Sequence, residues 1–197
     1  MNSYGEIESG WINLPTTHHE IQAFLKTQVG LNNRYEEYSI QDYESDFNFG
    51  EYENIYDLNL LAVKLEQMSK HEKTIAVTYC NANGLKDTLS LLNVCEQVND
   101  LSYVELDANA WGSREEKLGY AILDEINTDL KDTLEQYKLG SSLTAYDYFD
   151  FEKYGRDIAI AEGYFASEEI FLVYTSDIDH KLYTVEEIKD TLNDPRL

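Results

Sequence analysis

Residues 113–126 read SREEKLGYAILDEI, a helix start followed by a helical stripe. Ser113 and Glu116 have the spacing of a capping box, in which a hydroxyl and a carboxylate satisfy the free amide groups of the first helical turn. Apolar side chains then recur on one helical face, at Leu118, Ala121, Ile122 and Ile126. The stretch therefore predicts an amphipathic helix that buries one side and exposes the other.

The same start signal recurs along the chain, in the pairs Thr17 with Glu20, Ser69 with Glu72 and Thr184 with Glu187. Helical stripes follow as Ile21, Phe24 and Leu25; as Leu58, Leu61, Leu65 and Met68; and as Leu85, Leu89, Leu92 and Cys95. Segments rich in Tyr, Ile, Val and Phe predict strands at Trp11–Leu14, Tyr35–Tyr43, Leu101–Leu106, Ile158–Ala161 and Ile170–Tyr174. This irregular alternation predicts an α+β fold.

No linker rich in Pro, Gly or Ser divides the 197 residues, so shifts in composition set the expected boundaries. We expect small modules packed in series in an elongated chain. These are an N-terminal module of sheet and helix (1–53), a helical module (54–100), a C-terminal α+β module (101–175) and an extension (176–197) whose helix runs from Thr184 to about Leu192.

The charge is strongly negative, with 38 Asp and Glu against 15 Lys and Arg, a net charge of −23. This balance disfavours direct binding to nucleic acid or to anionic membranes, because both need a positive surface. Aromatic residues make up 13% of the chain, which is atypical of a disordered acidic tail. No apolar run approaches the ~20 residues of a membrane span. Without a basic apolar leader or a disulfide framework, the sequence predicts a cytoplasmic protein.

The acidic residues form long stretches without a cation. From residue 35 to residue 63 no Lys or Arg accompanies Glu36, Glu37, Asp42, Glu44, Asp46, Glu51, Glu53 and Asp57. Like charges held this close destabilise a compact fold, and interleaved aromatic residues offer anchors that would hold them in place. Duplex DNA carries one charge per roughly 1.7 Å, so 23 charges match roughly 40 Å of duplex. Imitation of DNA is one explanation; solubility, or adaptation to a salty cytoplasm, is the other.

Motifs for metal, cofactor or covalent chemistry are weak. Asp42, Glu44, Asp46 and Glu53 have calcium-loop spacing, but Phe47 stands where that loop needs Gly. The run 18–20, His-His-Glu, lacks zincin spacing and suits a first helical turn. Cys80 and Cys95 predict buried thiols. We expect no metal and no cofactor, and nothing positively indicates catalysis.

Two blocks resemble the ArdA antirestriction proteins. The first is YGEIESGWINLP at 4–15, followed by a capped helix and YEEYSIQDYE at 35–44; the second is YFDFEKYGRDI at 148–158, followed by Gly163-Tyr-Phe165, which looks like the strand after it. The resemblance implies a dimer that imitates bent B-form DNA. It implies occupation of the DNA groove in the methyltransferase core of type I restriction-modification enzymes, so that a phage or mobile element escapes cleavage in its bacterial host.

The resemblance also implies which residues act. The expected mimic surface comprises Glu36, Glu37, Asp42, Glu44, Asp150, Glu152 and Asp157, with Asp46, Glu51 and Glu53 added on charge alone. Tyr148, Phe149, Phe151 and Tyr154 are candidates for the homodimer contact or for the core. Arg156 is expected to pair with Asp157 or another acid. The sequence departs from the pattern of the family at two places, the short segment before Tyr4 and the extension 176–197.

Two alternative functions also fit the acidic composition. A polyanionic surface would also fit other basic channels, which would make the protein an anti-CRISPR or an inhibitor of another DNA-binding defence system. An acidic hydrolase with a carboxylate pair is the alternative from another class. A hydrolase would lose turnover on a single Asp or Glu substitution, whereas a distributed binding surface would lose affinity by degrees.

Overall fold

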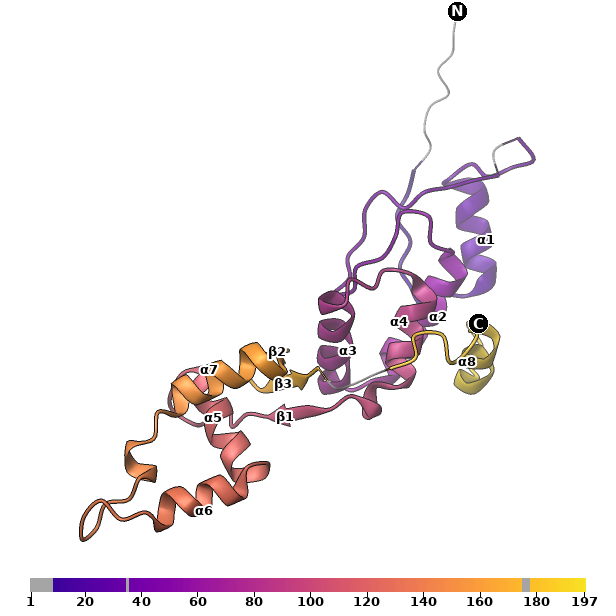
Figure 1. The fold of residues 1–197 in the computed structure, drawn as a ribbon. Helices are drawn as coiled ribbons and strands as arrows, with labels where there is room; N and C mark the ends of the chain where they lie inside the picture. The colour runs from indigo at the N-terminus through magenta and orange to yellow at the C-terminus, as the bar shows by residue number, and fades with distance from the viewer. Residues whose placement is uncertain (1–8, 35, 175–177) are drawn as a thin grey trace, which may run out of the picture. The chain divides into compact units, whose positions relative to one another are not determined.

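A computed structural model describes residues 9–34, 36–174 and 178–197 (Figure 1). The chain divides into two compact units: an N-terminal unit, made of residues up to 98 together with 179–197, and an inserted unit, residues 99–178. Helices dominate both, and three strands form one sheet, so the predicted α+β class is confirmed. The division into four serial modules stays a prediction.

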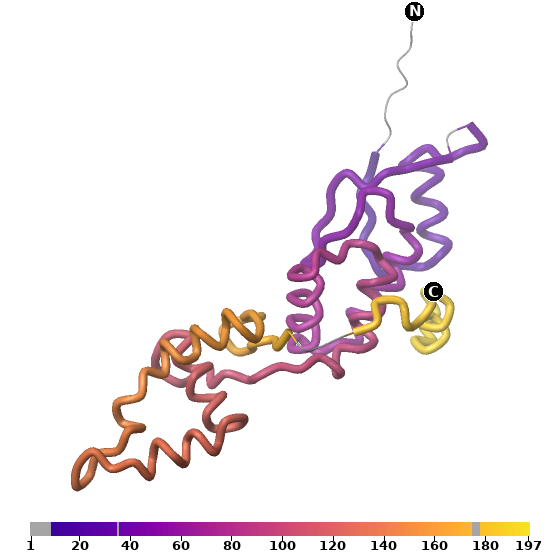
Figure 2. Tube along the Cα trace, viewed as in Figure 1, coloured from indigo at the N-terminus to yellow at the C-terminus, as the bar shows by residue number. Residues whose placement is uncertain are grey.

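Five helices build the N-terminal unit: α1 (His18–Thr27), α2 (Ile55–Gln67), α3 (Lys70–Ala82), α4 (Thr88–Glu96) and α8 (Val185–Leu192). Helix α2 packs against α4, α3 packs against α4, and α8 contacts both α2 and α4 (Figures 1 and 2). Their buried side chains include Leu60, Val63, Ile75, Leu91 and Leu92. A smaller cluster around Ile21, Leu25 and Ile55 joins α1 to the start of α2.

The predicted helix starts are confirmed. Thr17, Ser69, Ser113 and Thr184 are all N-caps, and all but Ser113 complete the reciprocal capping box. At α1, Glu20 accepts hydrogen bonds from the Thr16 hydroxyl, the Thr17 amide and the Thr17 hydroxyl. These bonds favour the ionised carboxylate and lower the pKa of Glu20 to about 2.

We expect Glu20→Ala to destabilise the N-terminal unit at neutral pH but not in strong acid. The native pKa lies below the ordinary value of 4.5, so the carboxylate's contribution is present above that value and lost as the pH falls toward 2. Thermal unfolding of both proteins between pH 7 and pH 2 measures the difference. A gap between the two midpoints that stays constant over this range would contradict the assignment.

The inserted unit combines one sheet with three helices. Its strands are β1 (Tyr103–Glu105), β2 (Gly163–Phe165) and β3 (Ile170–Val173), antiparallel in the order β1-β3-β2, with Val104 opposite Phe171 and Tyr164 opposite Leu172. Its helices are α5 (Arg114–Glu125), α6 (Thr128–Gln136) and α7 (Phe151–Glu162). The core combines sheet and α5 side chains, namely Val104, Leu106, Leu118, Ile122 and Phe171. Short 3-10 turns lie at Val98–Asp100 and Tyr146–Tyr148.

Helices α5 and α7 lie side by side (Figure 1). Glycines stand where their backbones come closest. A Cβ on Gly155 would lie 1.8 Å from the carbonyl oxygen of Glu115, and a Cβ on Gly119 would lie 2.2 Å from that of Phe151. Both distances are far inside van der Waals contact, so each position needs a residue without a side chain. The close crossing explains the glycine in the stretch Tyr154–Asp157.

Three strand predictions were wrong. Residues 11–14 and 36–43 form no strand, and residues 158–161 lie within α7. Pro15 lacks an amide donor, and the described part of 35–43 makes one backbone bond across the loop, from Ile40 N to Glu51 O at 2.8 Å, instead of a ladder. The Ile158–Ala161 stretch continues a helix that Asp150 caps. A small N-terminal sheet is therefore not found among the described residues.

The remaining strand predictions were correct. Strands β1 and β3 fall within the expected Leu101–Leu106 and Ile170–Tyr174, and β2 occupies Gly163–Phe165. Helix α6 was not predicted, since no side chain caps it and none of its residues is buried. Within the described ranges, no helix has both the length and the apolar character that crossing a bilayer requires.

Candidate functional site

A long irregular segment in the N-terminal unit carries most of the predicted carboxylates. This acidic loop, residues 36–53, contains no helix or strand and no Lys or Arg. Its exposed carboxylates are Glu36, Glu37, Asp42, Glu44, Asp46 and Glu51. Among the described residues none of these six carboxylates forms an ion pair. The loop therefore presents several exposed negative charges to solvent.

Tyr38 fixes the acidic loop to the start of α2. Its hydroxyl accepts a hydrogen bond from the Ile55 amide at 2.8 Å and lies 3.3 Å from the carbonyl oxygen of Glu53, to which it donates. The Ile55 amide belongs to the first turn of α2, where amides have no partner inside the helix. Partial burial of the hydroxyl raises the pKa of Tyr38, so it stays neutral and keeps its proton to donate.

Glu53 fixes the other end of the loop to α4. One of its carboxylate oxygens accepts from the Thr88 amide at 2.9 Å and from the Thr88 hydroxyl at 2.5 Å. This half-buried carboxylate is used inside the unit, unlike the exposed six. Between the two ends, the Phe47 side chain is 2% exposed and therefore acts as a hydrophobic anchor. Within the loop itself, the rings of Tyr43 and Phe49 pack together with centroids 3.9 Å apart.

We expect Tyr38→Phe to lower the free energy of unfolding of the N-terminal unit by about 1–2 kcal/mol, because it leaves the Ile55 amide without its acceptor. Chemical denaturation measures the loss, and hydrogen exchange should localise it to residues 38–55. Tyr52→Phe is the matched control, since the Tyr52 side chain is 79% exposed. Equal stability of the two variants would contradict the anchoring role of the hydroxyl.

The predicted carboxylates of the inserted unit are exposed but locally paired. Asp150 caps α7 by accepting from the Lys153 amide at 2.9 Å. The other two form ion pairs one turn apart on the same helix, Glu152 with Arg156 at 3.2 Å and Asp157 with Lys153 at 2.7 Å. Arg156 thus pairs with another acid rather than with Asp157. These pairs neutralise two of the three acidic residues of α7, so this set is a weaker polyanion than the acidic loop.

The four candidate dimer residues divide into packed and exposed side chains. Phe151 is buried, stacked on Tyr120 with ring centroids 3.9 Å apart. Phe149 packs edge-on against both Phe151 and Tyr154. Tyr148 differs, with its side chain 67% exposed. Among the four, Tyr148 is therefore the side chain best placed for contact with another molecule.

One carboxylate of α2 is influenced by charge from a distant part of the sequence. Burial chiefly, then the negative charges of Glu186 and Glu53, raise the pKa of Asp57. Asp57 is in the first turn of α2, and Glu186 is in the first turn of α8. The charge count pointed to Asp57, but no local pattern connects it with Glu186, which lies 129 positions further along the chain. The C-terminal extension thus adds negative charge beside α2.

Negative charge is shared almost equally between the two units. The N-terminal unit, counted over residues 1–98 and 179–197, has 20 acidic and 9 basic residues, a net charge of −11. The inserted unit has 18 acidic and 6 basic residues, a net charge of −12. Neither unit resembles a neutral domain with an acidic tail.

The weak metal and thiol motifs have structural explanations. In the described part of the chain no group of three or more His, Cys, Asp or Glu side chains converges as a metal site would require. Phe47, at the position where a calcium loop needs Gly, is a core residue. His18 opens α1 and stacks on Tyr56, with ring centroids 4.5 Å apart. Both cysteines are free and buried, as predicted, and burial raises the pKa of Cys95 to about 12.

Comparison with known proteins assigns the chain to a family. Searches against curated proteins and against solved structures found no match. A family model described as "Antirestriction protein (ArdA)" matches residues 3–172. The match spans both blocks that suggested the resemblance, the acidic loop and the glycine crossing of α5 and α7, and it ends within β3. With 170 of its 197 residues in the match, the chain belongs to the ArdA antirestriction family.

Proposed function

We propose that the protein inhibits type I restriction-modification enzymes by occupying the DNA-binding groove of their methyltransferase core, and that it does so as a homodimer. The observation that carries the proposal is the acidic loop, whose six exposed carboxylates form no ion pair with any residue in the described ranges. A groove that binds DNA is lined by Lys and Arg side chains that contact phosphates. Carboxylates held on a folded scaffold would meet the same side chains.

The fixed attachment of the acidic loop supports binding rather than simple solubility. A flexible acidic segment would pay an ordering cost when it bound, whereas a preorganised one pays less. Tyr38, Phe47 and Glu53 tie the loop to the helical core at three places. Solubility alone would not require these anchors.

The expected mechanism is stoichiometric competition, and the protein is not an enzyme. Affinity spread over many exposed charges implies that any one substitution has a small effect and that several together have a large one. The interaction should also weaken with salt, since ions screen exposed charges beyond about 8–10 Å at physiological strength. A single substitution that abolished activity would favour catalysis instead.

Target choice is tested by a panel of purified defence enzymes. The protein is titrated into DNA cleavage assays of a type I restriction enzyme, a type II restriction enzyme and an RNA-guided nuclease, at matched ionic strength. We expect inhibition of the type I enzyme at protein concentrations close to that of the enzyme. Inhibition of the RNA-guided nuclease alone would support mimicry directed at another target. Inhibition of none would refute the proposal.

A further inference from the structure

A buried asparagine of α4 binds the main chain of the C-terminal segment, residues 179–197. The Asn93 side chain is 0% exposed. Its Oδ1 accepts from the Tyr183 amide at 2.8 Å, and its Nδ2 donates to the Tyr183 carbonyl at 2.9 Å. The main-chain N–H and C=O of Tyr183 are thus both hydrogen-bonded to the Asn93 side chain, much as a neighbouring β-strand would bond them.

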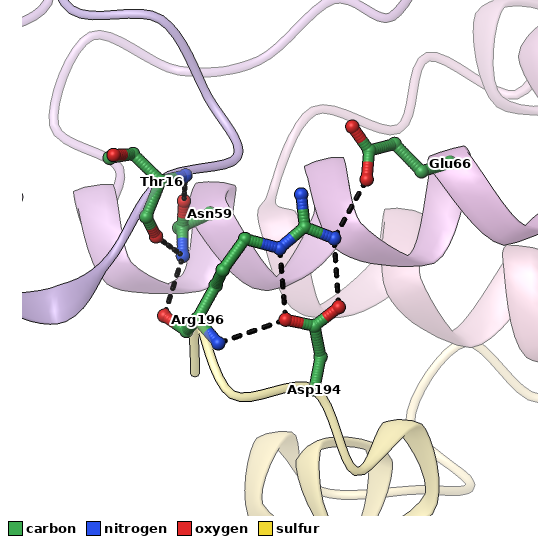
Figure 3. A network of polar contacts seen from close by, with 5 residues as sticks. All are labelled: Thr16, Asn59, Glu66, Asp194 and Arg196. Atoms are coloured by element: carbon green, nitrogen blue, oxygen red, sulfur yellow. Dashed lines mark hydrogen bonds and ion pairs between the residues drawn. The ribbon is translucent and has the colours of Figure 1, made fainter.

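Two further buried amides face the same segment. Gln97, the C-cap residue of α4 one turn after Asn93, is 7% exposed and donates from Nε2 to the Asp179 carbonyl at 2.8 Å. Asn59 of α2, 2% exposed, donates from Nδ2 to the Arg196 carbonyl at 3.5 Å and exchanges shorter bonds with the main chain of Thr16 (Figure 3). Side-chain amides that hydrogen-bond to main-chain N–H and C=O groups bind a peptide backbone whatever its side chains are.

Side chains of the segment supply the specificity that main-chain contacts lack. Ile188 of α8 is 1% exposed, and α8 packs on α2 and α4. Arg196 lies 2.7 Å from the Glu66 carboxylate of α2 and also pairs with Asp194 at 2.8 Å (Figure 3). The Arg196 side chain and amide together lower the pKa of Asp194 to about 2. The segment is therefore held by an apolar side chain near its middle, Ile188, and by ion pairs near its end, at Arg196.

We propose that α2 and α4 form a peptide-binding site whose ligand is the chain's own residues 179–197. Without the segment, the buried Asn93 Oδ1 would lose the hydrogen bond from the Tyr183 amide, which costs free energy. Gln97 and Asn59 would each lose one bond and keep another, to the main chain of Asn93 and of Thr16, so the segment stabilises α2 and α4 mainly through Asn93. The family match ends at residue 172, so nothing in the family assignment accounts for the segment. The proposal is independent of the proposed function, because it concerns how the N-terminal unit is completed.

A full-length Ile188→Asp chain tests the site, since a charge in the buried position should displace the segment. A fluorescently labelled synthetic peptide of residues 179–197 is titrated into this variant and into the wild-type chain. We expect saturable binding to the variant and much weaker binding to the wild type, whose own segment has the advantage of high effective concentration. Equal binding to both chains, or no binding to the variant, would overturn the proposal.

A second substitution tests whether the Asn93 side-chain amide contributes to peptide binding. Adding Asn93→Ala to the Ile188→Asp chain should weaken peptide binding roughly tenfold or more, because it removes two hydrogen bonds to the Tyr183 main chain. Asn48→Ala is the matched control, since Asn48 is an exposed amide of the same unit that bonds Asn81 at 2.8 Å. Equal losses from the two substitutions would overturn the assignment.

The wild-type chain supplies a test that does not depend on a variant folding. Hydrogen exchange should show the Tyr183 amide and the amides of α8 protected to the same degree as those of α4, because the segment and the helices open together. Exchange of residues 183–192 at the rate of an unfolded peptide would overturn the proposal. A concentration-dependent dimer that exchanges segments between copies would overturn the intrachain assignment.

Discussion

Replacing Gly155 with alanine is expected to unfold residues 99–178 under conditions in which the wild-type chain stays folded. The new Cβ would lie 1.8 Å from the Glu115 carbonyl oxygen, a backbone atom that cannot rotate away. Helices α5 and α7 would have to separate, and the core around Leu118 and Ile122 would lose its packing. We expect a loss of about 3 kcal/mol or more in the free energy of unfolding.

Two comparison variants make this result specific. Gly119→Ala places a Cβ 2.2 Å from the Phe151 carbonyl oxygen and should be nearly as damaging. At Gly140, in the same unit, a Cβ would meet no atom within 4 Å, so Gly140→Ala is the control. Calorimetry gives the midpoints, and hydrogen exchange separates the inserted unit from the N-terminal unit. A Gly155→Ala protein as stable as Gly140→Ala would contradict the close crossing.

Neutralising the acidic loop is expected to produce the largest loss of function without unfolding the protein. The variant carries four substitutions at exposed carboxylates that form no ion pair with a described residue, Glu36→Gln, Glu37→Gln, Glu44→Gln and Asp46→Asn. An exposed charge contact contributes about 0.2–1 kcal/mol, so four together should weaken inhibition roughly 4- to 700-fold. Inhibition of type I cleavage measures the loss, and an unchanged unfolding midpoint shows that the fold is intact.

The control removes the same charge elsewhere. It carries Glu125→Gln, Asp132→Asn, Glu135→Gln and Asp190→Asn, all at exposed positions outside the loop. This variant should lose only the general attraction of a more negative protein, which acts mainly on the association rate. The double variant Glu152→Gln with Asp157→Asn should also have a small effect, because both carboxylates already pair with cations of α7. Equal losses in all three variants would mean that the loop has no special role.

Much of the fold was predictable because its signals are local. A capping box contains its own reason for starting a helix, and all four predicted starts are helix N-caps. The strand prediction over residues 35–43 failed because the deciding interaction is distant. Tyr38 suits a strand by residue type, yet its hydroxyl is committed to the start of α2. No residue pattern within the segment 36–43 indicates that the Tyr38 hydroxyl will bond to Ile55.

The candidate site was predictable as a composition and less so as an arrangement. The absence of cations between residues 35 and 63 is visible in the sequence, and it selects the acidic loop. The sequence does not show which of these carboxylates bond to other parts of the protein. Glu53 has the charge of its neighbours but binds Thr88, 35 residues away, and the charge of Glu186 in the C-terminal extension helps to raise the pKa of Asp57. Such roles depend on tertiary contacts that no spacing rule encodes.

Competition between the protein and DNA for one methyltransferase core tests the central claim most directly. Labelled protein is titrated with a type I methyltransferase core at several fixed concentrations of a duplex that carries the recognition site. We predict that the apparent dissociation constant rises in proportion to the DNA concentration, since the carboxylates and the phosphates would occupy the same cationic groove. An apparent dissociation constant that DNA leaves unchanged, with a ternary complex of core, DNA and protein, would contradict the account.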